Sequence, residues 1–223
     1  MRFVVRILCV VAALVALPLV GATVLARGGI LGGAALSLLG ALWVWLWLPR
    51  VAHSAFEEGK YAVAGRRYRW LEWLASSPAR ERAARLSRAG CAVAGGDVTT
   101  ADKLLAAIDL STLAAAERAV WLNNRACAQL AVGADPAAAL ALADEAGSLR
   151  PDVPALQHTR AMALIAVGRT DDAIAILDGM RTGGELPARL EADRCRELAL
   201  AWTAKGETAY AEDYRIRAEA YSR

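Results

Sequence analysis

The stretch "NRACAQLAVGADPAAALALADEAGSLRP" (Asn124–Pro151) decides the fold of this 223-residue chain. It reads as a helix, a glycine turn at Gly133 and a second helix. Ala126 lies seven residues before the glycine and Ala138 lies five residues after it. Small side chains at these two positions let two helices approach closely. The stretch therefore predicts two helices that pack against each other across a glycine turn.

The same spacing recurs along the chain with a period of about 36 residues, which is the mark of a repeat architecture. The turn glycines are Gly59, Gly96, Gly133, Gly168 and Gly206. An alanine precedes each glycine by seven residues: Ala52, Ala89, Ala126, Ala161 and Ala199. Another follows each glycine by five residues: Ala64, Ala101, Ala138, Ala173 and Ala211. The pattern predicts an all-α domain of about five helix pairs.

Here the sequence resembles the tetratricopeptide repeat (TPR). Asn124–Pro151 and "TRAMALIAVGRTDDAIAILD" (Thr159–Asp178) carry the small–Gly–Ala spacing of that family, and Pro151 stands where its closing proline does. The resemblance extends from Trp45 to Tyr221. It implies a right-handed superhelix of helix pairs whose concave groove binds peptides or partner helices. Other α-solenoids remain an alternative, because the family's early tryptophan and mid-helix tyrosine are mostly missing.

The resemblance places the groove lining on the first helix of each pair. The implied lining is mainly apolar, with Asn123, His158 and Arg196 as polar points. Such a surface favours an amphipathic helix or an apolar peptide as ligand. The alternative is that the lining is covered by the final helix of the chain or by self-association. The groove residues are Leu86, Gly90, Val93, Asn123, Asn124, Cys127, Leu130, His158, Met162, Ile165, Arg196 and Leu200.

An arginine recurs on successive first helices, at Arg88, Arg125 and Arg160. Pairing with nearby acids is one interpretation, and recognition of an acidic partner is the other. Asn124 and Arg125 also match an Asn-Arg-small element of TPR domains that grip the terminal carboxylate of a peptide. The lysines that this activity needs are absent from the partner positions, so we do not expect it.

The region before the repeats is strongly apolar. Residues 7–26 and 30–48 carry no charge, and Arg27-Gly28-Gly29 alone separates them. A helix of about 20 residues crosses the hydrocarbon layer of a membrane, so each run is long enough to span it. We predict a transmembrane hairpin over residues 1–48 and the repeat domain over 49–223. The first run is alternatively a cleaved signal peptide.

Tryptophan and arginine mark the exit from the second run. Tryptophan collects at the membrane–water boundary because its ring is apolar while its N–H seeks water. Farther along, a basic–aromatic face lies in one helical sector and suits anionic head groups, although repeat packing is the alternative use of its tryptophans. The predicted membrane-interface residues are Trp43, Trp45, Trp47, Arg50, Arg66, Arg69, Trp70 and Trp73.

Arginine is far more frequent next to the two ends of the hairpin than in its turn. The positive-inside rule therefore predicts that the repeat domain is cytoplasmic. Display of the repeats in the periplasm is the alternative. Arginine greatly outnumbers lysine and alanine is abundant, which hints at a GC-rich bacterial genome and hence at the bacterial inner membrane.

No catalytic or metal-ligand pattern stands out. The only histidines, His53 and His158, lie in different repeats, and the four cysteines are solitary. The formal charge of +3 comes from the first 27 residues, so nucleic-acid binding lacks electrostatic support. We expect no enzyme and no cofactor. The expected function is a membrane-anchored scaffold or assembly factor that binds a partner protein. The alternative is an accessory subunit of a larger membrane complex, and homo- or hetero-oligomers are open.

Overall fold

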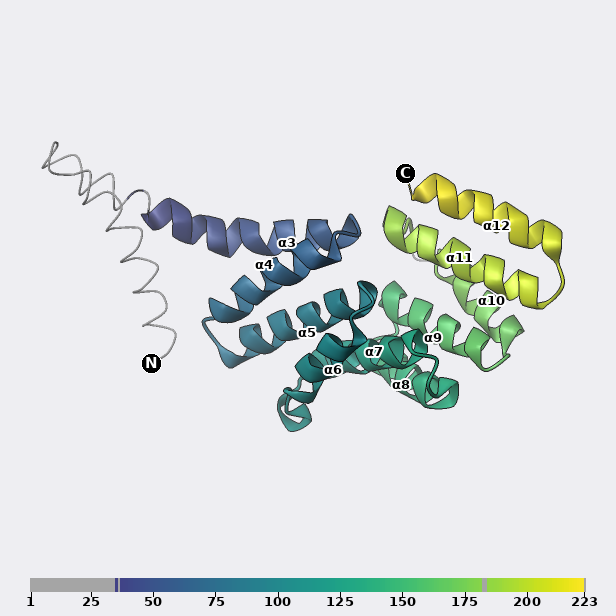
Figure 1. Ribbon diagram of the computed structural model, residues 1–223, viewed down its shortest axis with the longest axis horizontal. Coiled ribbons are helices and arrows are strands. Elements are labelled where there is room, and N and C mark those ends of the chain that lie inside the picture. The colour runs from purple at the N-terminus through teal and green to yellow at the C-terminus, as the bar shows by residue number, and fades with distance from the viewer. Residues whose placement is uncertain (1–34, 36, 182–183, 223) are drawn as a thin grey trace, which may run out of the picture.

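The computed structural model describes residues 35, 37–181 and 184–222, and every regular element among them is helical (Figure 1). The predicted all-α class is therefore confirmed for this part of the chain. The elements are a π-helical turn η1 (Trp43–Trp47), α3 (Leu48–Glu57), α4 (Tyr61–Trp73), α5 (Pro78–Ala94), α6 (Val98–Ala106), a 3₁₀ turn η2 (Leu110–Thr112), α7 (Ala115–Ala131), α8 (Pro136–Leu149), α9 (Pro154–Ala166), α10 (Thr170–Gly179), α11 (Ala188–Ala204) and α12 (Thr208–Tyr221).

The five predicted turn glycines all lie between the two helices of a pair. Each has a positive φ, from 61° at Gly133 to 81° at Gly206. Residues with a Cβ rarely adopt this left-handed conformation, so glycine is the residue that ends the first helix at low cost. The next N–H then bonds back over the turn, as from Lys60 to the carbonyl of Ala55 at 2.8 Å. This motif reverses the chain and starts the second helix.

The alanines of the repeat form the contacts between helices. All five alanines that precede a turn glycine are buried, with at most 4% of their surface exposed. Four of those that follow a glycine are also buried: Ala64, Ala101, Ala173 and Ala211. A side chain of one carbon lets two backbones pack closely, which is why the repeat uses alanine at these positions.

The third pair departs from the predicted register. Ala138 is only half-buried, whereas Ala139 is completely buried. The reason is the length of the turn: α8 begins three residues after Gly133, while the second helix of every other pair begins two residues after its glycine. The additional residue, Ala134, shifts the buried face of α8 by one position.

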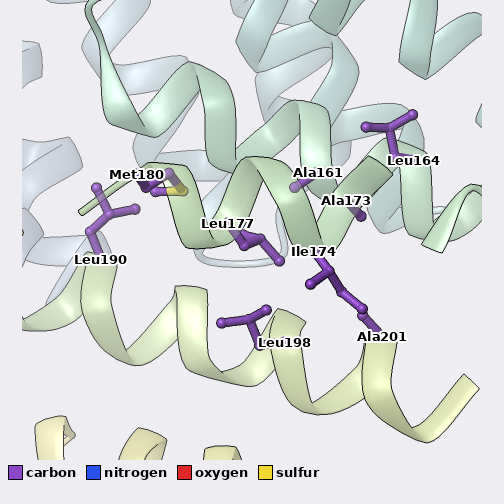
Figure 2. Packing of buried hydrophobic residues seen from close by; sticks show 9 residues of the cluster. All are labelled: Ala161, Leu164, Ala173, Ile174, Leu177, Met180, Leu190, Leu198 and Ala201. Atoms are coloured by element: carbon purple, nitrogen blue, oxygen red, sulfur yellow. The ribbon is translucent and has the colours of Figure 1, made fainter. Parts of the chain in front are cut away.

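The largest cluster of buried residues holds the fourth and fifth pairs together. Figure 2 shows Ile174 and Leu177 of α10 directed toward Leu198 and Ala201 of α11. Leu177 and Leu198 are fully buried. Truncation of such a leucine to alanine typically costs about 2 to 5 kcal/mol, so this cluster stabilises the C-terminal part of the domain.

The helices follow one another in a curved row (Figure 1). Each helix from α3 to α12 contacts the next, and α5, α7, α9 and α11 also contact one another in succession. Because the row curves, the end of α3 meets the beginning of α11, where Glu57 Oε2 lies 3.7 Å from Arg189 Nε. The first helices of the pairs consequently share one inner side.

The helix that leads into the domain is continuous. Residues 37–42 are helical, and the chain passes through η1 into α3 without a break. The predicted second span therefore ends inside this helix, with no linker before the repeats. No helix within the described residues has both the length and the apolar character to cross a membrane. The predicted span over 7–26 lies outside the described residues, and that over 30–48 lies only partly within them.

Candidate partner-binding groove

A cavity of about 450 Å³ lies on the inner side of the row. Its residues recur at helical spacing on the first helices, for example Asn123, Cys127 and Leu130 on α7 and His158 and Met162 on α9. Positions three or four apart share one helix face, so each first helix presents a stripe of side chains to the cavity. The remaining walls come from α5, from α11 and from the junction of α3 with α4.

The structure brings most of the predicted groove residues to this one cavity. They are Gly90, Val93, Asn123, Asn124, Cys127, Leu130, His158, Met162 and Arg196. None of the described residues of α12, the final helix, lines the cavity. The final helix therefore does not cover the cavity, which was one of the alternatives in the sequence analysis. Whether the cavity binds a partner remains a prediction.

Three of the predicted groove residues lie elsewhere. Leu86 is 3% exposed and packs with Leu105 in the core between α5 and α6. Ile165 packs against the cluster between α10 and α11. Leu200 is exposed and lines a separate hollow between α11 and α12. Each of the three lies three or four residues from a residue that lines the cavity, but its own side chain has other neighbours.

The cavity is closed at one side by residues that the sequence did not identify. The guanidinium of Arg189 lies over the Phe56 ring, 4.6 Å from its centroid. The same arginine is 3.7 Å from Glu57 Oε2 and 3.1 Å from Asp193 Oδ2. Tyr61 packs edge-on against Phe56. These contacts join the first helix pair to the last, and Glu197 of α11 completes the lining.

Asn124 braces two of the first helices instead of pointing freely into the groove. Its side chain is buried, and its Nδ2 donates to the carbonyl oxygen of Leu86 at 3.0 Å. Gly90 makes room for this contact, because a Cβ at that position would lie 3.3 Å from Asn124 Oδ1. Asn124 is thus committed to the packing of α7 on α5.

Three polar atoms of the cavity lining are shielded from solvent and form no hydrogen bond among the described residues: Asn123 Oδ1, His158 Nε2 and Arg189 Nε. The last of these still lies 3.7 Å from Glu57 Oε2, in an ion pair. Nearby, Cys127 Sγ and Thr159 Oγ1 lie 3.3 Å apart and satisfy each other. A buried polar atom without a partner costs free energy, so a ligand that supplies a hydrogen-bond donor to Asn123 Oδ1 and a polar partner to His158 Nε2 would gain from both.

Burial also shifts the ionisation of the groove. It lowers the pKa of His158, against the smaller opposing effect of Asp193, so this imidazole is neutral at pH 7. Burial raises the pKa of Glu197 to about 7, and the charge of Asp193 adds to that effect. At neutral pH the charged groups of the cavity are therefore the paired arginines, Asp193 and a Glu197 that is only about half ionised.

The arginines that recur on the first helices are all paired with acids on a preceding second helix. Arg88 pairs with Glu72 of α4. Arg125 Nη1 lies 2.6 Å from an oxygen of Asp102, and Arg160 Nε lies 2.6 Å from one of Asp144. These ion pairs connect successive helix pairs. With Asn124 and Arg125 both engaged, the side chains of the carboxylate-gripping element are not free.

The predicted membrane-interface residues lie in η1, at the start of α3 and along α4. Trp45, Trp47 and Trp70 are half or more exposed, at 50%, 60% and 56%. Trp73 is half-buried, and Arg50, Arg66 and Arg69 are exposed. The side chain of Trp43 lies outside the description. Val44, Trp45 and Pro49 share a cavity with Leu71 and Leu74, so the start of α3 lies beside the end of α4.

No protein-family model, curated protein or solved structure matches this chain. Among residues 35, 37–181 and 184–222, no three histidine, cysteine, aspartate or glutamate side chains come close enough together to hold a metal ion. The described cysteines, Cys91, Cys127 and Cys195, are free thiols, and burial raises the pKa of each. Raised thiol pKa values are typical of inert cysteines.

Proposed function

We propose that this chain is a membrane-anchored, TPR-like scaffold or assembly factor that holds a partner protein in its groove, close to the bacterial inner membrane. One observation carries the proposal. Residues chosen for their positions in the repeat, from four different first helices, line a single cavity of about 450 Å³. Concave surfaces built from stacked repeats are the usual binding sites of such folds.

The TPR-like assignment is supported by the repeated unit itself. Five helix pairs turn at glycines with positive φ, and small buried alanines form the contacts of each pair. Membrane attachment through residues 1–48 is supported by the two apolar runs and by the continuous helix that joins the second run to the repeats. A rigid connection of this kind would hold the groove at a fixed distance from the bilayer.

The chemistry of the groove favours an apolar segment of the partner. Val93, Leu130 and Met162 provide apolar wall, while Asn123 and His158 offer unpartnered polar atoms. A ligand that buries its own apolar stripe gains about 25 cal/mol for each Å². An amphipathic helix or an apolar peptide with one or two polar side chains meets both requirements.

A permanent place in a larger complex is a second candidate, favoured by the surface of the last helix pair. Leu200, Tyr210 and Ile216 are each more than half exposed, and a hollow of about 610 Å³ lies between α11 and α12. Leu200 lines this hollow, and contiguous apolar surface of several hundred Å² is typical of binding sites. An accessory subunit would use it as a constant interface. Its stability should then depend on the complex, so the isolated chain would lose its fold or aggregate.

The test of the groove is capture of partners from bacterial membranes with a tagged full-length chain, followed by mass spectrometry. Met162→Glu places a charge in the cavity and should abolish capture. Val132→Glu is the matched control, because Val132 is exposed outside the cavity and the change in charge is the same. Circular dichroism checks that both variants stay helical. If a folded Met162→Glu variant captures the same proteins as the control, the binding surface is not this groove.

A further inference from the structure

The described arginines divide into two groups. Every one from Arg82 to Arg217 forms an ion pair with an acidic side chain. Those before Arg82 form none with any described acid, and the sequence has no acid before Glu57. The second group comprises Arg50, Arg66, Arg67, Arg69 and Arg80. Among the described arginines, those without an ion pair are therefore confined to the beginning of the domain.

None of the other contacts of this group is an ion pair, although the pKa of Glu58 is lowered mainly by its hydrogen bond from Lys60 and to a small extent by the charge of Arg67. Arg50 and Arg67 donate to backbone carbonyls. Arg66 and Arg69 are exposed and donate to no acceptor among the described residues. Arg80 donates to Ser76 Oγ at 3.0 Å, and its guanidinium stands over the ring of Trp45, 4.1 Å from the centroid.

The nearby acids are already used. Glu72 binds both Arg85 and Arg88, and Glu81 binds Arg85 at 3.0 Å. Asp97 lines a hollow together with Arg66 and Arg69, but its carboxylate accepts from the Thr100 N–H and caps α6. Glu58 pairs with Lys60 at 2.6 Å. Five arginines without an ion pair therefore outnumber the carboxylates around them and give this region a positive field.

Exposed tryptophans occupy the same end of the molecule. The turn η1 with the start of α3, the end of α4 and the start of α5 lie together there (Figure 1). Trp45 and Trp47 belong to η1, in the first of these segments, and Trp70 comes from the second, edge-on against Trp73 with ring centroids 5.7 Å apart. Arg80 of the third segment touches Trp45. Tryptophan with arginine is the combination that suits the head-group layer of a bilayer.

We propose that this end of the domain docks on anionic phospholipid head groups. The inference rests on the membrane attachment proposed above, and it adds a second, lipid-selective contact to that attachment. Lipid is favoured over an acidic protein because the described part of the apolar run 30–48, from residue 37 onward, continues as one helix into this surface. Arg66 lies seven residues before Trp73, which is about 10 Å along α4. Because this distance is close to the Debye length at physiological salt, the charge of Arg66 is not fully screened at Trp73.

The experiment uses the full-length chain in nanodiscs of phosphatidylcholine, with or without about one third phosphatidylglycerol. Each arginine near an anionic surface strengthens contact about five-fold, which corresponds to about 1 kcal/mol. Acyl chains brominated near the head groups quench tryptophans that reach the bilayer. The difference in fluorescence between the unchanged chain and a Trp70→Phe variant gives the signal of Trp70. A Trp202→Phe variant gives in the same way the signal of Trp202 on the distant α11, which is the control. The double variant Arg66→Glu/Arg69→Glu tests the charge, against the control Arg215→Glu/Arg217→Glu, which makes the same change in charge on α12.

We expect bromine to quench Trp70 in the anionic nanodiscs but not Trp202. Reversal of Arg66 and Arg69 should reduce the docking equilibrium by at least about 25-fold and remove this quenching, whereas reversal of Arg215 and Arg217 should leave it unchanged. A chain that inserts into the nanodisc but leaves Trp70 unquenched, or quenched equally without phosphatidylglycerol, overturns the lipid contact alone. A chain that does not associate with nanodiscs overturns the membrane attachment and the lipid contact with it.

Discussion

Replacement of Arg194 by methionine is expected to destabilise the junction of α10 and α11 strongly. Arg194 is 3% exposed and binds Glu191 through two hydrogen bonds, of 2.9 and 2.7 Å. A third bond, of 3.2 Å, reaches the carbonyl oxygen of Leu177 on α10. Hydrogen bonds from Arg194 lower the pKa of Glu191, against the opposing effect of burial, so this glutamate is ionised at neutral pH.

The magnitude follows from what the substitution leaves behind. Removal of one partner of a buried ion pair leaves an uncompensated buried charge, which typically costs about 3 to 5 kcal/mol. Arg181 lies 3.9 Å from Glu191 Oε1 and offsets part of that cost. We therefore expect a loss near the lower end, about 3 kcal/mol of the free energy of unfolding. The double substitution Arg194→Met/Glu191→Leu removes both charges and should recover most of the loss.

Urea unfolding of the full-length chain, followed by circular dichroism, measures the loss. Hydrogen exchange should locate it in α10 and α11, because a repeat protein is stabilised mainly through contacts between neighbours. Arg217→Met is the matched control, since its ion pair with Asp213 is half exposed, and such pairs contribute less than about 1 kcal/mol. Equal unfolding midpoints for Arg194→Met and the control would refute the reasoning, as would a double variant less stable than Arg194→Met.

Three further outcomes are expected. Because burial raises the pKa of Glu197 to about 7, the folded state holds a proton that the unfolded chain releases near the ordinary glutamate pKa. Stability should therefore fall as pH rises from about 5 to about 7, and a Glu197→Gln variant whose unfolding midpoint falls equally would contradict this. Gly90→Val should displace Asn124 and weaken partner capture, while Gly59→Ala, at a turn outside the cavity, should lower stability without changing capture. If the repeat domain is cytoplasmic, a fluorescent protein fused to the C-terminus should fluoresce, and alkaline phosphatase fused there in a separate chain should be inactive. The reverse result places the repeats in the periplasm.

The repeat could be predicted from the sequence because a left-handed turn and a close helix contact each demand one small residue type. Glycine at a positive φ and alanine at a crowded helix contact recur in every repeat, although the other positions of the repeat differ. The register of the third pair was missed because Ala134 lengthens its turn by one residue. Asp135-Pro136 was the available signal, since Asp135 accepts hydrogen bonds from two N–H groups of α8 and Pro136 occupies its first position.

The groove was predicted only in part. The resemblance to TPR domains placed Cys127, Leu130 and Met162 in the lining, and the helical period of 3.6 residues accounts for their recurrence on one helix face. Leu86 and Leu200 have the same spacing but are turned toward other neighbours, which depends on how the helices cross. The contact of Phe56 with Arg189 joins segments far apart in the sequence, and no local pattern reports it.

A photo-crosslinker in the groove tests the central claim most directly. Met162 is replaced by p-benzoylphenylalanine in the full-length chain, and the same residue is placed at Ala175, which is exposed on α10 outside the cavity, as a control. After irradiation in intact bacteria, position 162 should form one defined adduct, and its crosslinked peptide should come from an apolar or amphipathic segment of another protein. Adducts of equal yield at position 175, or adducts only with a second copy of this chain, would contradict a partner-binding groove.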